Sequence, residues 1–188
     1  MTFAKSMMTT AAAVALTAGV AHAENPMVGG AEMFANMNIV ENAVNSADHT
    51  TLVAAVQAAG LAETLAGEGP FTVFAPTNAA FDRLTPEGTV EELLKPENKA
   101  QLTELLTCHV VEGAVMSEAI KGMIAGDGGV HQVTTLGGCV LNASVADDGR
   151  ILLGDENQNG AFVEIADVVQ SNGVIHVIDG VIVPEGQH

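Results

Sequence analysis

The sequence predicts an α+β domain in which helices dominate the first half of the chain and strands dominate the second. Between residues 38 and 125, apolar side chains recur mostly at helical spacing, and from residue 130 onward they alternate at strand spacing. A parallel α/β fold would instead alternate helices and strands along the whole chain. The chain has 188 residues, a length that fits one domain with an adequate core.

Residues 38–66 are expected to be helical. A second helix within this region can be capped by Thr50 or Thr51. Gly60 is suited to end it, because glycine readily adopts the left-handed conformation found after a helix. Residues 24–37 are rich in Gly and Met and show little periodicity, so we expect a flexible lead-in there.

A buried strand is expected to follow the helices. Phe71–Ala75 is rich in aromatic and β-branched residues, and Pro76 ends it because proline cannot donate to a sheet ladder. A second short strand is expected to begin at Val110. Thr77 or Asn78 is expected to cap a further short helix, Pro96 to stand in the first turn of the next, and Ser117 to cap a helix at residues 118–125.

The second half predicts a series of strands separated by turns. Glycine-containing pairs such as Asp148-Gly149 and Asn159-Gly160 are typical of hairpin turns. The strand candidates are Val130–Leu136, Cys139–Val145, Arg150–Leu153, Ala161–Val169 and Val174–Val183.

The composition is strongly acidic, with a formal net charge of −17. Nucleic acids and anionic membranes are recognised by Lys and Arg, so the charge argues against both kinds of partner. Solubility accounts for spread acidic residues better than divalent-cation binding does. The chain has neither Trp nor Tyr, which weighs against sugar stacking and against a large aromatic interface.

Residues 1–23 have the pattern of a signal peptide. Lys5 precedes an apolar run at residues 11–20, and Ala21-His22-Ala23 supplies the small-x-small cleavage pattern. The apolar run is shorter than the ~20 residues of a transmembrane helix. We therefore expect a secreted protein, periplasmic or extracellular, without stable membrane insertion.

Cys108 and Cys139 are the two cysteines of the chain. In an exported protein two thiols favour a disulfide, and a loop of about 30 residues would stabilise the fold by roughly 3–4 kcal/mol. The alternatives are two buried free thiols, or a metal site that also uses His109 and His131. The chain has no CxxC or HxxH spacing to favour the metal site.

Three segments resemble the motifs of the fasciclin domain family. They are Phe71–Phe81, the Leu105–Gly113 segment around His109, and Asn172–Pro184. The resemblance implies a β-sandwich or wedge of about seven strands with helices packed around it, spanning residues 38–184 before a short tail at 185–188. We expect the first and last segments to lie side by side at its centre. The motif residues are Phe71, Thr72, Phe74, Ala75, Pro76, Asn78, Phe81, His109, Asn172, Gly173, His176, Asp179 and Pro184.

The chain also departs from the family pattern. Cys108 stands where the family usually has Tyr beside His109, and Glu112 stands where Pro is common. Asp167-Val168 replaces a frequent Asp-Ile pair, which is implicated in integrin contacts in animal members. The first departure fits the proposed disulfide, and the last argues against an animal-type receptor role.

His109 and His176 lie in apolar strand surroundings, and a structural role is favoured over that of a ligand or general base. Asp179 falls on the opposite strand face from His176, so the two form no obvious dyad. Residues 155–160 match the first half of a calcium loop, but Ala166 stands where a bidentate Glu is needed. A polar hairpin tip is favoured there, and weak calcium binding stays open.

The sequence contains no Gly-x-Ser-x-Gly, His-Glu-x-x-His or phosphate-loop motif. We therefore expect no enzymatic activity, no cofactor and no metal centre. The resemblance implies a binding module for cell adhesion or extracellular-matrix interaction. We expect an unidentified surface or extracellular partner, and a chain that is monomeric or weakly self-associating. The alternative is a soluble carrier of a small apolar ligand, held in a pocket between helices and sheet.

Overall fold

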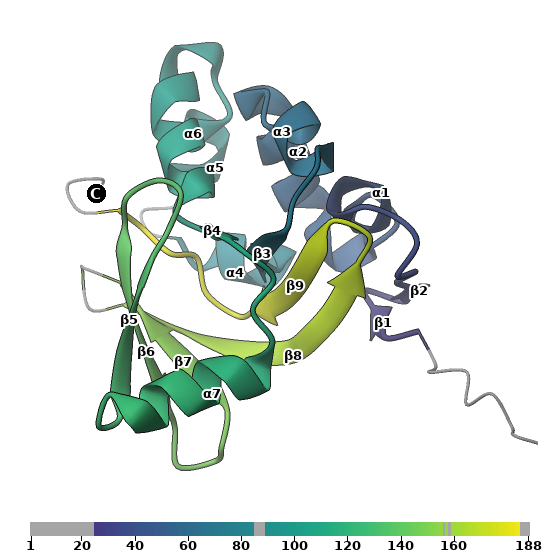
Figure 1. The fold of residues 1–188 in the computed structure, drawn as a ribbon. Helices are drawn as coiled ribbons and strands as arrows, with labels where there is room; N and C mark the ends of the chain where they lie inside the picture. Colours follow the sequence, from purple (N-terminus) through teal and green to yellow (C-terminus); the bar gives the residue numbers. More distant parts are fainter. Residues whose placement is uncertain (1–24, 85–88, 156, 158, 185–188) are drawn as a thin grey trace, which may run out of the picture.

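Seven strands form one mixed sheet in the spatial order β4-β3-β9-β8-β7-β6-β5 (Figure 1). The computed structural model describes residues 25–84, 89–155, 157 and 159–184. The expected signal peptide and the expected tail at 185–188 lie outside these residues. The strands are β3 (Phe71–Pro76), β4 (Val110–Glu112), β5 (Val130–Thr134), β6 (Val140–Val145), β7 (Ile151–Gly154), β8 (Gly160–Gln170) and β9 (Gly173–Ile178).

The central pair of the sheet joins the two segments that were expected to meet. β3 and β9 run parallel, from Phe71 opposite Gly173 to Pro76 opposite Ile178. The other neighbouring strands of the sheet pair antiparallel. The parallel contact is possible because about a hundred residues of chain separate the two strands, room for the required crossover. The predicted α+β class is confirmed.

Helices cover the sheet in two groups. In Figure 1 the helices α1 to α6 lie on the side of β3 and β9, whereas α7 crosses beside β5 and β6. The α-helices are α1 (Ile39–Ala43), α2 (Thr50–Ala59), α3 (Ala62–Ala66), α4 (Asn78–Asp82), α5 (Thr89–Leu93), α6 (Lys99–Thr107) and α7 (Ser117–Gly126), and the 3₁₀ turns are η1 (Ala47–His49) and η2 (Pro96–Asn98). None of the described helices combines the length and the apolarity of a membrane span.

Two apolar cores follow from this arrangement. The first lies between α1–α6 and the central strands, and contains Leu52, Leu102, Leu105, Val73 and Ile175. The second lies between α7 and the sheet, and contains Ile124 of α7, Leu141 and Leu153 of β6 and β7, and Phe74 and Ile178 of the central strands. β8 and β9 contribute to both cores, and two register shifts bend β8 on its way from one to the other.

The two ends of the sheet are tied together beside the disulfide. The Leu136 N–H donates to the Val110 carbonyl at 2.7 Å, and the Gly137 N–H donates to the Thr107 carbonyl at 3.0 Å. Cys108 and Cys139 form a disulfide at this position, with their Cα atoms 5.4 Å apart. The sheet therefore comes close to a closed barrel.

Residues before α1 differ from the expected flexible lead-in. β1 (Met27–Val28) and β2 (Ala31–Glu32) form a short hairpin. Val28 and Met33 are 4% and 2% exposed, so this segment covers part of the first core. The buried Asn42 side chain donates to the Phe34 carbonyl at 2.8 Å and accepts from the Phe34 N–H at 3.0 Å. These contacts give the segment a fixed path that its sequence periodicity did not reveal.

Two predicted boundaries also differ. Ser117 is the first residue of α7, not its cap, because its hydroxyl donates to the Asp167 carboxylate instead. β9 ends at Ile178, before the predicted end at Val183, since the Asp179 carboxylate turns back to accept from the Phe162 N–H at 2.7 Å.

Candidate binding groove

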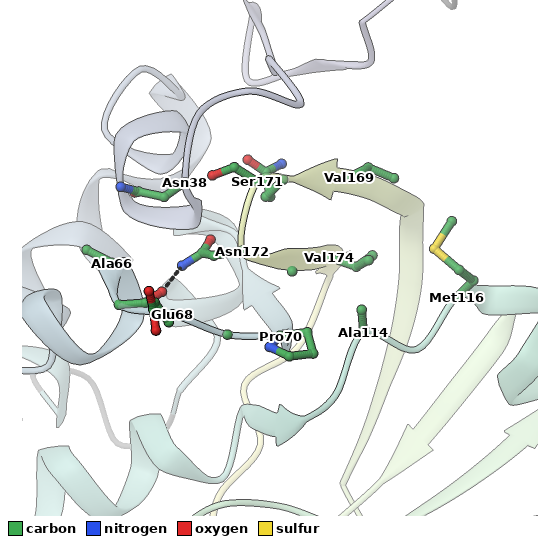
Figure 2. A pocket seen from close by; sticks show the side chains of 14 residues that line it. Asn38, Ala66, Glu68, Pro70, Ala114, Met116, Val169, Ser171, Asn172 and Val174 are labelled. Carbon is green, nitrogen blue, oxygen red and sulfur yellow. Dashed lines mark hydrogen bonds between the residues drawn. The ribbon is translucent and has the colours of Figure 1, made fainter.

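An open groove of about 780 Å³ lies where the central strands β3 and β9 begin. Figure 2 shows its lining side chains. One wall comes from Asn38 and the α3–β3 connection at Ala66–Pro70. The facing wall comes from Ala114 and Met116, which precede α7, and the β8–β9 hairpin at Val169–Val174 runs between the walls.

Glycine lets the two chain segments at the base of the groove touch. A side chain on Gly69 would overlap the Asn172 carbonyl oxygen, and one on Gly173 would overlap the Phe71 carbonyl oxygen. In the space this leaves, the Phe71 N–H donates to the Asn172 carbonyl at 3.1 Å. Larger residues at either position would separate β3 from β9 and remove the base of the groove.

The Asn172 side chain fixes the first wall. Its Oδ1 accepts from the Ile39 N–H at 3.0 Å, at the start of α1. Its Nδ2 donates to the Leu65 carbonyl at 2.8 Å, near the end of α3, and to the Gly67 carbonyl at 2.9 Å, the bond that is dashed in Figure 2. An amide is required here because the position needs one acceptor and two donors on the same side chain.

Thr72 and Asp167 fix the facing wall. The Thr72 hydroxyl donates to the Gly113 carbonyl at 2.6 Å and accepts from the Val115 N–H at 2.8 Å. The Asp167 carboxylate accepts from the Ser117 N–H at 2.6 Å, and Asp167 reaches this position with φ of 61°, which is uncommon outside glycine. The residues around Met116 are thus held from both sides by side chains of the sheet.

His176 and His109 each bridge two backbone groups. His176 Nε2 donates to the Val115 carbonyl at 2.9 Å, and its Nδ1 accepts from the Asp167 N–H at 3.2 Å. His109 uses the opposite tautomer, in which Nδ1 donates to the Leu105 carbonyl at 2.8 Å and Nε2 accepts from the Ile182 N–H at 2.9 Å. These tautomers are assigned from the hydrogen-bonding partners.

Both imidazoles are held neutral. Burial lowers the pKa of His176, although its hydrogen bond to the Val115 carbonyl works in the opposite direction. Burial likewise lowers the pKa of His109 to about 4, against the opposing effect of the Leu105 carbonyl. His176 stacks on Phe74, with the ring centroids 5.7 Å apart. Each ring uses both nitrogens for structure and leaves neither free for a substrate.

The other motif residues lie in the core or tie segments together. Asn78 accepts from the Thr51 N–H at 3.0 Å and so supplies the cap of α2 that Thr50 or Thr51 was expected to give. Thr77 caps α4, accepting from the Ala80 N–H at 3.2 Å. Phe74, Ala75, Phe81 and Pro184 are buried, and Phe71 is half-buried.

The polar hairpin tip at 155–160 is organised around Asp155. Its carboxylate accepts from the N–H groups of Asn157, Asn159 and Val183 at 2.9, 2.8 and 3.2 Å. The Asn159 side-chain amide donates to it as well, at 3.1 Å. Glu156 and Gln158 lie outside the described residues. The described donors use both oxygens of Asp155 for the turn itself, as the hairpin interpretation requires.

No group of three or more His, Cys, Asp or Glu side chains in the described part of the chain is placed to hold a metal ion. The groove itself is apolar at its centre. Met116 and Val169 are 38% and 42% exposed, and Pro70, Ala114 and Val174 lie between or beside them. Among the described residues that line the groove, Glu68 is the one that carries a charge.

Sequence reasoning found the residues that support this groove but not its surface. Asn172 and Gly173 were identified from the motif, whereas Met116, Val169 and Glu68 were not. In the sequence, Gly67-Glu68-Gly69-Pro70 separates the predicted helical region from the first motif strand. A glycine-rich break directly before a motif strand was the available signal.

The fold and the groove define an α+β domain with an open groove at one end of its central strands. A family model described as the Fasciclin domain matches residues 47–184. The chain therefore belongs to the fasciclin domain family, as its motifs had indicated.

Two relatives and a solved structure illustrate the range of the family. Protein sll1483 of Synechocystis is 49% identical over 148 residues, covering 79% of this chain and 74% of that protein. The cell surface glycolipoprotein MPB83 of Mycobacterium bovis is 37% identical over 127 residues, covering 68% of this chain and 49% of that protein. A FAS1 domain pair from the insect cell adhesion molecule Fasciclin I aligns with a TM-score of 0.49 at 22% identity, covering 69% of this chain and 40% of that one.

Proposed function

We propose that this chain is a fasciclin-type binding module that acts outside the cytoplasm, attaching to a cell-surface or matrix component through the groove. The open apolar groove, built directly on the family motif residues, is the observation that carries this proposal. The name of MPB83, a cell surface glycolipoprotein, supports the location.

The groove suits a reversible contact. Its volume falls in the range of roughly 300–1,000 Å³ that is usual for binding sites. It has no Trp or Tyr to act as an anchor, so Met116 and Val169 are its largest exposed apolar side chains. Because both walls are fixed by hydrogen bonds, a partner would bind a surface that is already formed, which lowers the entropic cost of association.

The alternative of a small-ligand carrier receives less support. Two voids lie between the helices and the sheet, where such a ligand was expected, and their volumes are about 30 and 40 Å³. Ligand pockets commonly start at roughly 300 Å³. Neither void has room for an apolar ligand beyond the size of a few water molecules.

Binding of the immobilised protein to cell-envelope material from its own host tests the proposal. We expect Met116→Asp to reduce binding at least about tenfold, because it places a charge in the apolar centre of the groove. Val44→Asp is the matched control, since Val44 is 52% exposed and does not line the groove. Equal binding by the two variants would show that the groove is not the contact surface.

A further inference from the structure

We propose that the occupant of the groove is a basic, extended segment of another polypeptide, with an apolar side chain seated on the Met116–Val169 surface and a Lys or Arg beside Glu68. This inference rests on the proposed function and specifies its partner. It follows from three features of the groove: its charge, its apolar centre and its glycine-rich wall.

The edge of the groove is acidic. Glu68 is exposed and lines the groove. The Glu41 carboxylate accepts from the backbone N–H of Asn38, a lining residue, at 2.9 Å. Glu112 is exposed and pairs with Phe71, the residue after Pro70 at the base of the first wall. One acidic residue thus lines the groove, a second is hydrogen-bonded to a lining residue, and a third is exposed two residues before the lining residue Ala114.

No described cation offsets these carboxylates. Of the described Lys and Arg residues, none lines the groove. Most of them make ion pairs within the chain elsewhere, namely Arg83 with Asp179, Lys95 with Glu92, Lys121 with Glu118, and Arg150 with Asp148 and Glu164. The local charge therefore has the same sign as the net charge of −17, and favours a cationic partner.

Charge also decides against a second copy of this chain. Pairing two grooves would bring together carboxylates of the same sign on two strongly acidic molecules, which is repulsive. The same repulsion disfavours an acidic polypeptide or an anionic membrane as the occupant of the groove.

The apolar centre decides against a simple inorganic cation or a small polyamine. Met116 and Val169 are partly exposed to solvent, and burying them requires an apolar surface on the partner. A polypeptide that carries both Lys or Arg and apolar side chains supplies the two kinds of surface at once.

The glycine-rich part of the first wall offers one side chain to a partner. Between Gly67 and Gly69 the wall carries one side chain, that of Glu68. The space that a side chain on either glycine would need is already taken by backbone of this chain, the Asn172 carbonyl at Gly69 and the Thr64 carbonyl at Gly67. Glu68 is therefore the side chain that this stretch offers to a partner, and an extended segment along the wall would place its cationic side chain beside Glu68 and its apolar side chain toward Met116.

Fluorescence anisotropy with short labelled peptides tests the inference. We expect a peptide that alternates leucine and lysine to bind, and to bind more weakly as the salt concentration rises. A peptide that alternates leucine and glutamate should not bind. A peptide that alternates serine and lysine should bind at least about tenfold more weakly than the leucine–lysine peptide, because it lacks the apolar contact.

Two charge-reversal variants locate the contact. Glu68→Lys should weaken binding of the leucine–lysine peptide about tenfold, since an attraction becomes a repulsion. Glu97→Lys makes the same change in net charge at an exposed residue outside the groove, and should alter binding less than about twofold. Equal effects of the two variants would attribute binding to net charge alone and overturn the inference.

The envelope-binding measurement separates this inference from the proposed function. If Met116→Asp abolishes envelope binding while the leucine–lysine peptide fails to bind, the groove is the contact surface and its partner is not a basic peptide. If Met116→Asp and Val44→Asp bind the envelope equally, the proposed function fails first, and peptide binding that depends on Glu68 would then stand as a property of the isolated groove.

Discussion

Acidification should destabilise this domain mainly through its buried histidines, with His109 as the largest measurable case. The His109 Nε2 accepts a hydrogen bond from the Ile182 N–H, so a proton on that nitrogen would face another donor. Burial lowers the pKa of His109 to about 4, compared with 6.5 for an ordinary histidine. Burial lowers the pKa of His49 and of His176 as well, so all three act in the same direction.

The sign and size follow from proton linkage. Between pH 6.5 and about 4 the unfolded chain binds a proton at position 109 and the folded chain does not, so stability falls as the pH falls through this window. Above pH 6.5 both states are neutral there and the effect disappears. Moving from pH 7 to pH 4.5 should remove about 2 kcal/mol of the free energy of unfolding through His109 alone. That is a large fraction of the ~5–15 kcal/mol typical of a domain.

Urea unfolding at pH 7 and pH 4.5 measures this loss. Circular dichroism is the suitable probe, because the chain has no Trp or Tyr. His109→Gln should be less stable than the unmodified protein at pH 7, and should lose about 2 kcal/mol less on acidification. Ile151→Val, a change in the buried core worth about 1 kcal/mol, controls for destabilisation without loss of a titrating group. If His109→Gln and the unmodified protein lose equal stability on acidification, the reasoning about His109 is refuted.

Three further predictions concern the segments that shape the groove and close the sheet. Asn172→Asp should lower the free energy of unfolding by about 2–4 kcal/mol, since a carboxylate would replace two donors that face carbonyl groups; an unchanged urea midpoint would contradict this. Gly173→Ala should cost at least about 3 kcal/mol through overlap with backbone, whereas Gly122→Ala, in open space on α7, should be neutral or stabilising by up to about 1 kcal/mol; thermal melting compares the two. Replacing Cys108 and Cys139 by Ser should cost roughly 3–4 kcal/mol for their separation of 31 residues, and reductant should then have no further effect on the urea midpoint.

The central strands could be predicted from the sequence because their signals are local. Phe71–Ala75 and Val174–Ile178 are rich in aromatic and β-branched residues and are bounded by proline, glycine or aspartate. The resemblance then supplied their pairing, which periodicity alone cannot give. The ends of helices and strands were less predictable where a terminal residue hydrogen-bonds to a distant side chain and not to its own element. Ser117 could not be recognised as a partner of Asp167, fifty residues away, by any local rule.

The hairpin before α1 and the groove were missed for the same physical reason. Two-residue strands show no periodicity, and this hairpin owes its place to the burial of Val28 and Met33 against the core. The groove depends on a backbone contact between Gly69 and Asn172, which are about a hundred residues apart. Both features arise from tertiary contacts that a single sequence does not display.

The disulfide between Cys108 and Cys139 affects how readily the chain pairs with other chains, so this tendency differs before and after oxidation. Strands at the rim of an unclosed sheet are templates for association, and here the rims formed by β4 and β5 are brought together at Val110 and Leu136. Where thiols stay reduced, the contact between these two edges is held by the backbone hydrogen bonds of Leu136 and Gly137 and by packing. Once the two cysteines are oxidised, the disulfide links the two edges of the sheet covalently, and the edges cannot separate unless that bond is broken. The same polypeptide is therefore more prone to cross-chain pairing before oxidation than after it.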